Sequence, residues 1–185
     1  MRKIGLVGEA PNDTESIKHL MEKKYNSGFE FIFMLDRLNG SKLDSQKTKR
    51  FLRIEYESKN PEIVIFIRDL DSVLPNKKMQ TERKLYFSAS NSVVDKKGIY
   101  LLHIYEIEAL ILSDIEIFNQ IYNSKLSPVE DPMFIEEPKE YLREREQNYN
   151  ESHNPEIFKS IRFEKALECR YFSEFISKFD KIVSA

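Results

Sequence analysis

The 185-residue chain has few of the residues that define several large protein classes. It has no tryptophan and one cysteine, so no disulfide can form within the chain and no cluster of thiolates can bind a metal. A single cysteine suits the reducing cytoplasm, where we expect the protein to be located. No stretch approaches the roughly 20 apolar residues that a membrane-spanning helix needs. The apolar run near the N-terminus is too short for a signal peptide, so the sequence predicts a soluble protein that does not contact a membrane.

An excess of charge of one sign is also missing. The chain has 29 Lys and Arg residues against 31 Asp and Glu residues, which gives a formal net charge of −2. This balance argues against a protein that coats nucleic acid through bulk charge. A local basic patch is nevertheless present, and it consists of Lys42, Lys47, Lys49, Arg50 and Arg53. Either a solvated helix face or a surface that contacts the phosphate backbone of nucleic acid explains it.

The apolar pattern predicts strands and helices in alternation. Residues 3–7, 29–34, 63–67 and 99–104 are short apolar runs, and longer amphipathic or polar segments separate them. The five consecutive apolar residues at 63–67 suit a strand that is buried on both faces of a parallel sheet. The order of the segments predicts an α/β fold with a mainly parallel four-stranded sheet flanked by helices. Helices are expected at residues 17–25, 41–59, 76–90 and 106–122.

The last third of the chain differs in composition. Residues 127–154 hold three of the seven prolines and have weak apolar periodicity, so we predict a long connection with one short helix at residues 139–146. Residues 158–183 carry a Phe-rich stripe with helical spacing, which we interpret either as core or as packing in a homodimer. We therefore divide the chain into an α/β domain, residues 1–126, and a helical C-terminal extension, residues 127–185, packed on the same domain.

Acidic residues follow two of the expected strands directly. Glu9 comes after the first strand, and Asp69 and Asp71 come after the strand at residues 63–67. Ligands of open parallel sheets bind beyond the carboxyl ends of the strands. Residues two apart in an extended segment point to the same side, so both aspartates can face one site. Asp13 can join them from the first turn of the following helix. The sequence therefore predicts a pocket with four carboxylates.

Four carboxylates in one pocket repel one another. Two like charges 4 Å apart repel by about 4 kcal/mol at an effective dielectric near 20, so the pocket needs protons or a cation. Oxygen ligands favour Mg²⁺ or Mn²⁺, and these cations stabilise the attacking and leaving oxygens in phosphodiester chemistry. The alternative is that the Asp-x-Asp pair forms a turn and that Glu9 and Asp13 belong to a helix cap. Glu106 and Glu108 are explained either as further pocket acids or as an acidic first helical turn.

Three segments resemble the TOPRIM domain of topoisomerases, primases and several nucleases. KIGLVGEAPND is similar to the strand that ends in Glu, with a second acid four residues later as in the nuclease TOPRIM of overcoming-lysogenization-defect proteins. IVIFIRDLDS is similar to the strand that ends in Asp-x-Asp-Ser, and IYEIEALILSD resembles a segment of small stand-alone bacterial TOPRIM-like proteins of undetermined role. The resemblance covers residues 1–122. Ala10 and Pro11 depart from it, because many members have Glu-Gly at these positions.

The resemblance implies a Rossmann-like TOPRIM fold and metal-dependent chemistry on nucleic acid. It implies that Glu9 is a general acid/base or a metal ligand, and that Asp69 and Asp71 are Mg²⁺ ligands. The accessory residues that it implies are Asp13, Ser72, Glu106 and Glu108.

Two functions of different classes fit these observations. The first is a Mg²⁺- or Mn²⁺-dependent nuclease that acts on DNA or RNA and uses the basic patch to contact phosphates. The second is a non-catalytic TOPRIM-like module that works with a partner, such as an ATPase in bacterial defence or DNA repair. The small size, the near-neutral charge and the departure at Ala10 and Pro11 favour the second. A receiver-like pocket that accepts phosphate from a kinase is disfavoured, because no clear lysine follows a later strand.

Overall fold

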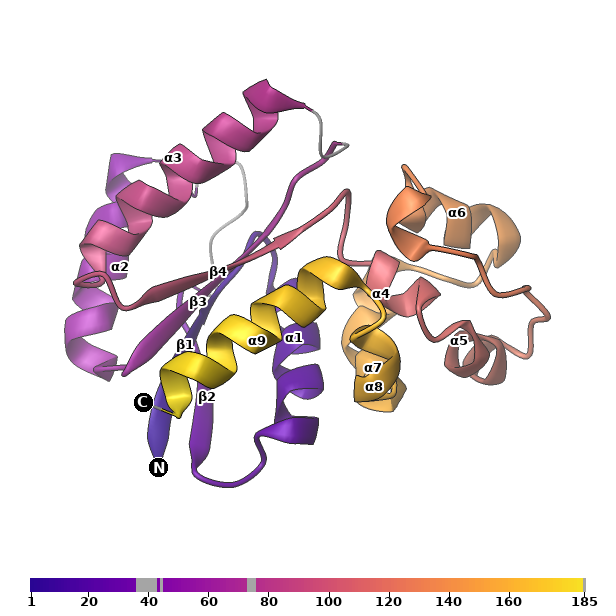
Figure 1. Cartoon of the computed structure of the whole chain (residues 1–185), viewed down its shortest axis with the longest axis horizontal. Coiled ribbons are helices and arrows are strands. Elements are labelled where there is room, and N and C mark those ends of the chain that lie inside the picture. Colours follow the sequence, from indigo (N-terminus) through magenta and orange to yellow (C-terminus); the bar gives the residue numbers. More distant parts are fainter. Residues whose placement is uncertain (36–42, 44, 73–75, 185) are drawn as a thin grey trace.

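The chain adopts an α/β fold around one parallel sheet (Figure 1). The structure is a computed structural model, and it describes residues 1–35, 43, 45–72 and 76–184. The sheet has the strand order β2-β1-β3-β4, and every neighbouring pair is parallel. The strands are β1 (Arg2–Val7), β2 (Phe29–Phe33), β3 (Ile63–Asp69) and β4 (Gly98–His103). The prediction of a parallel four-stranded α/β fold is therefore confirmed, and its two central strands, β1 and β3, are those that lead to Glu9 and Asp69.

Helices cover both faces of the sheet (Figure 1). On one face lie α1 (Pro11–Lys24) and α9 (Arg170–Val183), and on the other lie α2 (Gln46–Lys59) and α3 (Lys77–Val93). Two separate hydrophobic clusters fill these two interfaces, and all but the last residue of β3 are buried. The long apolar run of β3 is explained by this double coverage.

Alternation along β3 sends neighbouring side chains to opposite faces. Ile65 and Ile67 belong to the cluster that contains α1 and α9, whereas Val64 and Phe66 belong to the cluster that contains α2 and α3. Asp69 continues the first series, and the preceding Arg68 continues the second. The end of β3 therefore presents a carboxylate to one face and a guanidinium to the other.

The C-terminal part consists of short helices. They are α4 (Ala109–Leu112), α5 (Ile115–Tyr122), α6 (Pro138–Arg145), α7 (Asn154–Ser160) and α8 (Phe163–Ala166), with single 3-10 turns at Pro132–Phe134 and Glu151–His153. The short helix predicted at residues 139–146 is confirmed as α6. Within the residues that the structure describes, each helix is too short or too polar to cross a membrane.

Two helices that the sequence predicts as continuous are interrupted, and one ion pair accounts for a break in each. The second of them is interrupted again between α8 and α9. The segment 106–122 is broken before α5, where Asp114 leaves the helical conformation with φ −128° and ψ 55°. The segment 158–183 is broken between α7 and α8, where Arg162 is extended. The buried carboxylate of Asp114 accepts hydrogen bonds from Arg162 N at 2.9 Å and from Arg162 Nε at 3.0 Å. This contact between distant segments overrides local helical periodicity.

Residues of the C-terminal extension belong to the larger hydrophobic cluster. Leu142 of α6 and Phe172 of α9 are fully buried in it together with Leu20 of α1. Tyr25 and Phe179 pack edge to face, with ring centroids 4.9 Å apart. One core therefore joins the two ends of the chain.

We expect Phe172→Ala to lower the free energy of unfolding by about 3–5 kcal/mol, because it leaves a large cavity in this core. Ile182→Ala on the same helix is the matched control, since Ile182 is 44% exposed. The control should change stability by no more than about 0.5 kcal/mol. Urea denaturation of both variants measures the difference, and equal small effects would show that α9 is not a core element.

Candidate acidic site

A cavity of 360 Å³ lies at the carboxyl ends of β1 and β3. Three of the four acids predicted for one pocket line it: Glu9, Asp13 and Asp69. Glu108, which precedes α4, lines it as well. The cavity therefore collects four carboxylates from three segments that are far apart in the sequence.

Local geometry at the end of β1 brings Asp13 back to the strand. Pro11 is the first residue of α1, and the Ala10 N–H donates a hydrogen bond to Asp13 Oδ2 at 3.2 Å. Gly8 permits a close approach of the helix, because a Cβ at this position would lie 2.7 Å from Thr14 Cγ2. Asp13 is thus both a cap of α1 and a wall of the cavity, so the helix-cap interpretation and the pocket interpretation both hold for this residue.

Burial and mutual repulsion raise the pKa values of these acids. Burial, together with the carboxylates of Glu108 and Glu9, raises the pKa of Asp13 to about 7. Burial and the neighbouring acids, Asp13 first, also raise the pKa of Asp69 well above its usual value. Burial raises the pKa of Glu108. The cavity therefore favours whatever supplies positive charge, either protons or a cation.

Glu108 is fixed by residues of the C-terminal extension. Its Oε1 accepts a hydrogen bond from Asn154 Nδ2 at 2.9 Å and lies 3.4 Å from the Tyr149 hydroxyl. The same hydroxyl donates to Asn154 Oδ1 at 2.9 Å. All three side chains are buried. The extension therefore positions one of the cavity acids.

Lys139 supplies a positive charge to the same cavity. Its backbone N–H donates to Glu106 Oε2 at 3.0 Å, and its Nζ lies 3.2 Å from Glu106 Oε1 and 3.5 Å from Glu151 Oε2. Burial acts against its charged form, but the carboxylates of Glu106 and Glu108 outweigh that effect and raise the pKa of Lys139. The sequence did not indicate Lys139, Tyr149 and Asn154 as site residues. They lie within residues 127–154, whose weak apolar periodicity gives no signal of a site.

Asp71 does not line this cavity, contrary to the sequence prediction. Its backbone is left-handed, with a φ of 55°, so the two-residue alternation from Asp69 does not continue. Its carboxylate pairs with Arg83, with Oδ2 2.5 Å from Nη2. Asp71, Ser72 and Glu106 line a separate cavity of 460 Å³, and the Ser72 hydroxyl accepts a hydrogen bond from Asn76 Nδ2 at 2.9 Å. The structure therefore separates the two aspartates of the Asp-x-Asp motif.

Glu9 also has an arginine partner. Arg68 Nε donates a hydrogen bond to Glu9 Oε1 at 2.6 Å. The guanidinium carbon of Arg68 lies 4.3 Å from the centre of the Tyr86 ring, and Arg68 is only 6% exposed. Burial raises the pKa of Glu9, and the nearby Arg68 opposes that effect. Glu9 thus stands between the acidic cavity and a buried cation.

The predicted basic patch lies mainly on α2. Lys47 and Arg50 are exposed, Lys49 is half-buried, and Lys42 lies outside the described residues. Arg53 pairs with Glu57 and Asp95 and donates to the Val93 carbonyl at 3.0 Å, so it joins α2 to the end of α3. The patch is on the face of the sheet opposite α1.

The acids are oxygen donors of the kind that Mg²⁺ and Mn²⁺ prefer. Among the described residues, however, no three His, Cys, Asp or Glu side chains are arranged as a formed metal site. The oxygen donors of the cavity therefore suit Mg²⁺ or Mn²⁺. The carboxylates are too far apart to bind one ion together unless their side chains move. Glu9 would have to leave Arg68 before it could join such a cation.

No protein-family model matches the chain, and neither curated proteins nor solved structures give a match.

Proposed function

We propose that the chain is a TOPRIM-like enzyme that cleaves phosphodiester bonds in nucleic acid with Mg²⁺ or Mn²⁺. The observation that supports this proposal best is the cavity shared by Glu9, Asp13, Asp69 and Glu108. It lies at the carboxyl ends of two adjacent parallel strands, which is where open α/β sheets bind ligands. Burial and, after it, the neighbouring carboxylates raise the pKa values of Asp13 and Asp69, and a bound cation would offset both effects.

In this proposal Asp13 and Asp69 hold the cation, and Glu108 completes the acidic wall. A bound cation would neutralise charge on the phosphate and lower the pKa of water. Glu9 lines the same cavity and would accept a proton. Burial raises its pKa toward the working pH, which suits a general base. Lys139 balances part of the negative charge from the opposite wall.

A second candidate is a non-catalytic module that works with a partner such as an ATPase. The pairing of Glu9 with Arg68 and of Asp71 with Arg83 favours it, because two of the acids expected to act are neutralised by arginines. This candidate predicts no metal-dependent cleavage and co-purification with an ATPase.

The test of the proposed function is cleavage of labelled DNA and RNA by the wild-type protein with Mn²⁺ and with EDTA. Asp69→Ala is the informative variant, and Glu174→Gln on α9 is a control for an acid remote from the cavity. Loss of Mn²⁺-dependent cleavage in Asp69→Ala alone is expected. Equal cleavage by wild type and Asp69→Ala would remove the cavity from the mechanism.

A further inference from the structure

Two arginines stand beside the acidic site, and each holds a carboxylate. Arg68 binds Glu9, and Arg83 binds Asp71 while its Nε donates to the Asp69 carbonyl at 2.8 Å. Arg68 comes from β3 and Arg83 from the first half of α3. The side chains of Arg68 and Arg83 are 7% and 12% exposed. Two nearly buried cations are therefore concentrated next to a site that is otherwise acidic.

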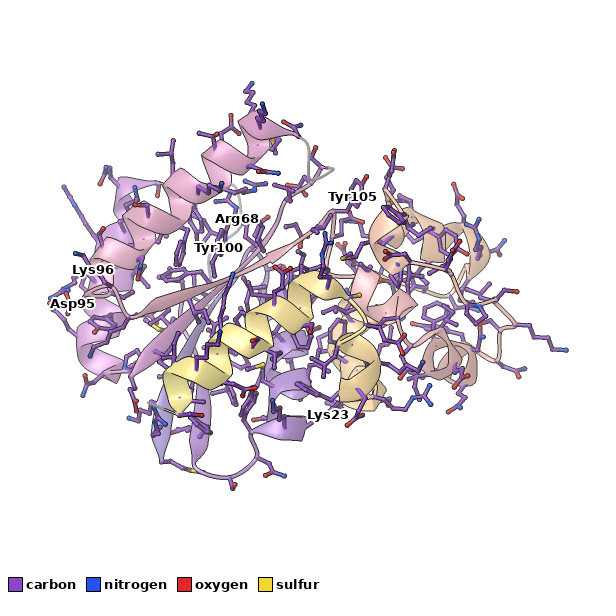
Figure 2. All side chains as sticks on the ribbon, viewed as in Figure 1. Lys23, Arg68, Asp95, Lys96, Tyr100 and Tyr105 are labelled. Atoms are coloured by element: carbon purple, nitrogen blue, oxygen red, sulfur yellow. The ribbon has the colours of Figure 1, made fainter. Side chains whose placement is uncertain are left out.

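Tyr100 adds an unsatisfied hydroxyl to this side of the sheet. Its side chain lies with Arg68 between the sheet and α3, as Figure 2 shows. Arg68 stacks on Tyr86, whose ring centre is 6.4 Å from that of Tyr100. The buried Tyr100 hydroxyl has no hydrogen-bond partner among the described residues. A buried donor without an acceptor is costly, so this position favours a ligand that accepts hydrogen bonds.

Arg68, Arg83 and Tyr100 lie on the same face of the sheet, the one that α3 covers. Burial raises the pKa of the Tyr100 hydroxyl, whereas the charges of Arg68 and Arg83 act to lower it. Both guanidinium groups therefore add positive charge on this face of the sheet. Their combined donors match the oxygens of a phosphate group, which arginine binds through paired hydrogen bonds.

We propose that Arg68, Arg83 and Tyr100 form a phosphate-binding site for nucleic acid, and that Glu9 and Asp71 occupy its arginines until nucleic acid binds. This inference rests on the proposed function. A backbone phosphate takes the guanidinium groups and releases the two carboxylates. Glu9 already lines the cavity with Asp13 and Asp69, and after this exchange its carboxylate no longer has an arginine partner there.

The exchange makes the two ligands cooperative. Nucleic acid removes the positive partner of Glu9, so it increases the affinity of the cavity for a cation. By thermodynamic linkage a cation that draws Glu9 away from Arg68 increases the affinity for nucleic acid by the same factor. Such a device strengthens cation binding when a substrate is present.

The test measures binding of each ligand separately in Arg83→Gln. We expect its affinity for a single-stranded oligonucleotide in EDTA to fall about tenfold, and the dependence of log K on log salt to lose about one unit of slope. Its affinity for Mn²⁺ without nucleic acid should rise severalfold, because a positive charge next to the acids is gone. Lys84→Gln, at the neighbouring exposed position, is the control and should change neither value by more than about twofold.

Opposite changes in the two affinities distinguish this proposal from simple misfolding, which would weaken both. Tyr100→Phe should weaken the oligonucleotide and leave Mn²⁺ binding unchanged. Unaltered oligonucleotide binding in Arg83→Gln, or Mn²⁺ binding that is not tightened, overturns the inference, even if the wild type cleaves nucleic acid. Inorganic phosphate is the second probe. If it binds to the wild type but not to Arg83→Gln, and does not displace the oligonucleotide, the inference is also overturned, because the site would then bind free phosphate and not nucleic acid.

Discussion

Asp69→Ala is expected to lower the rate of Mn²⁺-dependent cleavage about 1000-fold, whereas Asp71→Ala lowers it no more than about tenfold. A cation contributes several kcal/mol to the stabilisation of charge in such a transition state, and each 1.4 kcal/mol is worth a factor of ten in rate. Asp69 lines the acidic cavity, and Asp71 faces a separate one. The loss of Asp71 therefore removes only a nearby charge and a partner of Arg83.

Single-turnover cleavage of a labelled oligonucleotide at saturating Mn²⁺ measures this difference. Circular dichroism of both variants controls for folding. Equal and large losses in the two variants would mean that Asp71 joins Asp69 at the cation, as the resemblance to TOPRIM proteins implies. A larger loss in Asp71→Ala would contradict the arrangement of the site.

Asp13→Asn is expected to be more stable than the wild type at pH 8 without metal, by about 2 kcal/mol, and nearly equal at pH 4. The folded-state pKa of Asp13, about 7, is above its unfolded value, so the folded state binds the extra proton. The stability that this proton contributes is present below about pH 4 and is lost as the pH rises through 7. The full pKa shift corresponds to about 4 kcal/mol of stability. We halve this free energy for solvent screening, because Asp13 is only half-buried.

Asparagine is the suitable replacement because its side-chain oxygen still accepts the hydrogen bond from Ala10 N. Burial lowers the pKa of His103 to about 3, which gives an opposite pH dependence, but this contribution is the same in both proteins and cancels in the difference. Urea denaturation in EDTA at pH 4, 6 and 8 measures the difference in stability between the two proteins. If Asp13→Asn is the less stable protein at pH 8, the Asp13 carboxylate is not under repulsion.

The sheet and the location of the acids could be predicted from sequence for a simple reason. The apolar run at residues 63–67 is long enough to indicate burial on both faces, and Glu9 and Asp69 directly follow such runs. Adjacent parallel strands then bring these residues to one edge of the sheet, and the structure confirms the adjacency of β1 and β3. This part of the site depends on local pattern and on general rules of topology.

The rest of the site depends on contacts that no local pattern encodes. Asp71 leaves the cavity because of its left-handed backbone, which the sequence of an ordinary Asp does not reveal. Arg68 directly precedes the Asp-x-Asp motif, yet its pairing with Glu9 depends on strand register. Tyr149 and Asn154 reach Glu108 from a segment without periodicity. Contacts of this kind can be identified only from the folded structure.

Calorimetric titration of the wild type and Asp69→Asn with Mn²⁺ measures whether the carboxylates of the cavity bind a cation. Saturable binding to the wild type is expected, together with release of protons at pH 7 from the acids whose pKa values are raised. Binding to Asp69→Asn should be at least tenfold weaker, since each 1.4 kcal/mol of lost interaction is a factor of about ten. Identical isotherms for the two proteins, or no binding to either, would contradict the claim that these carboxylates form a cation site.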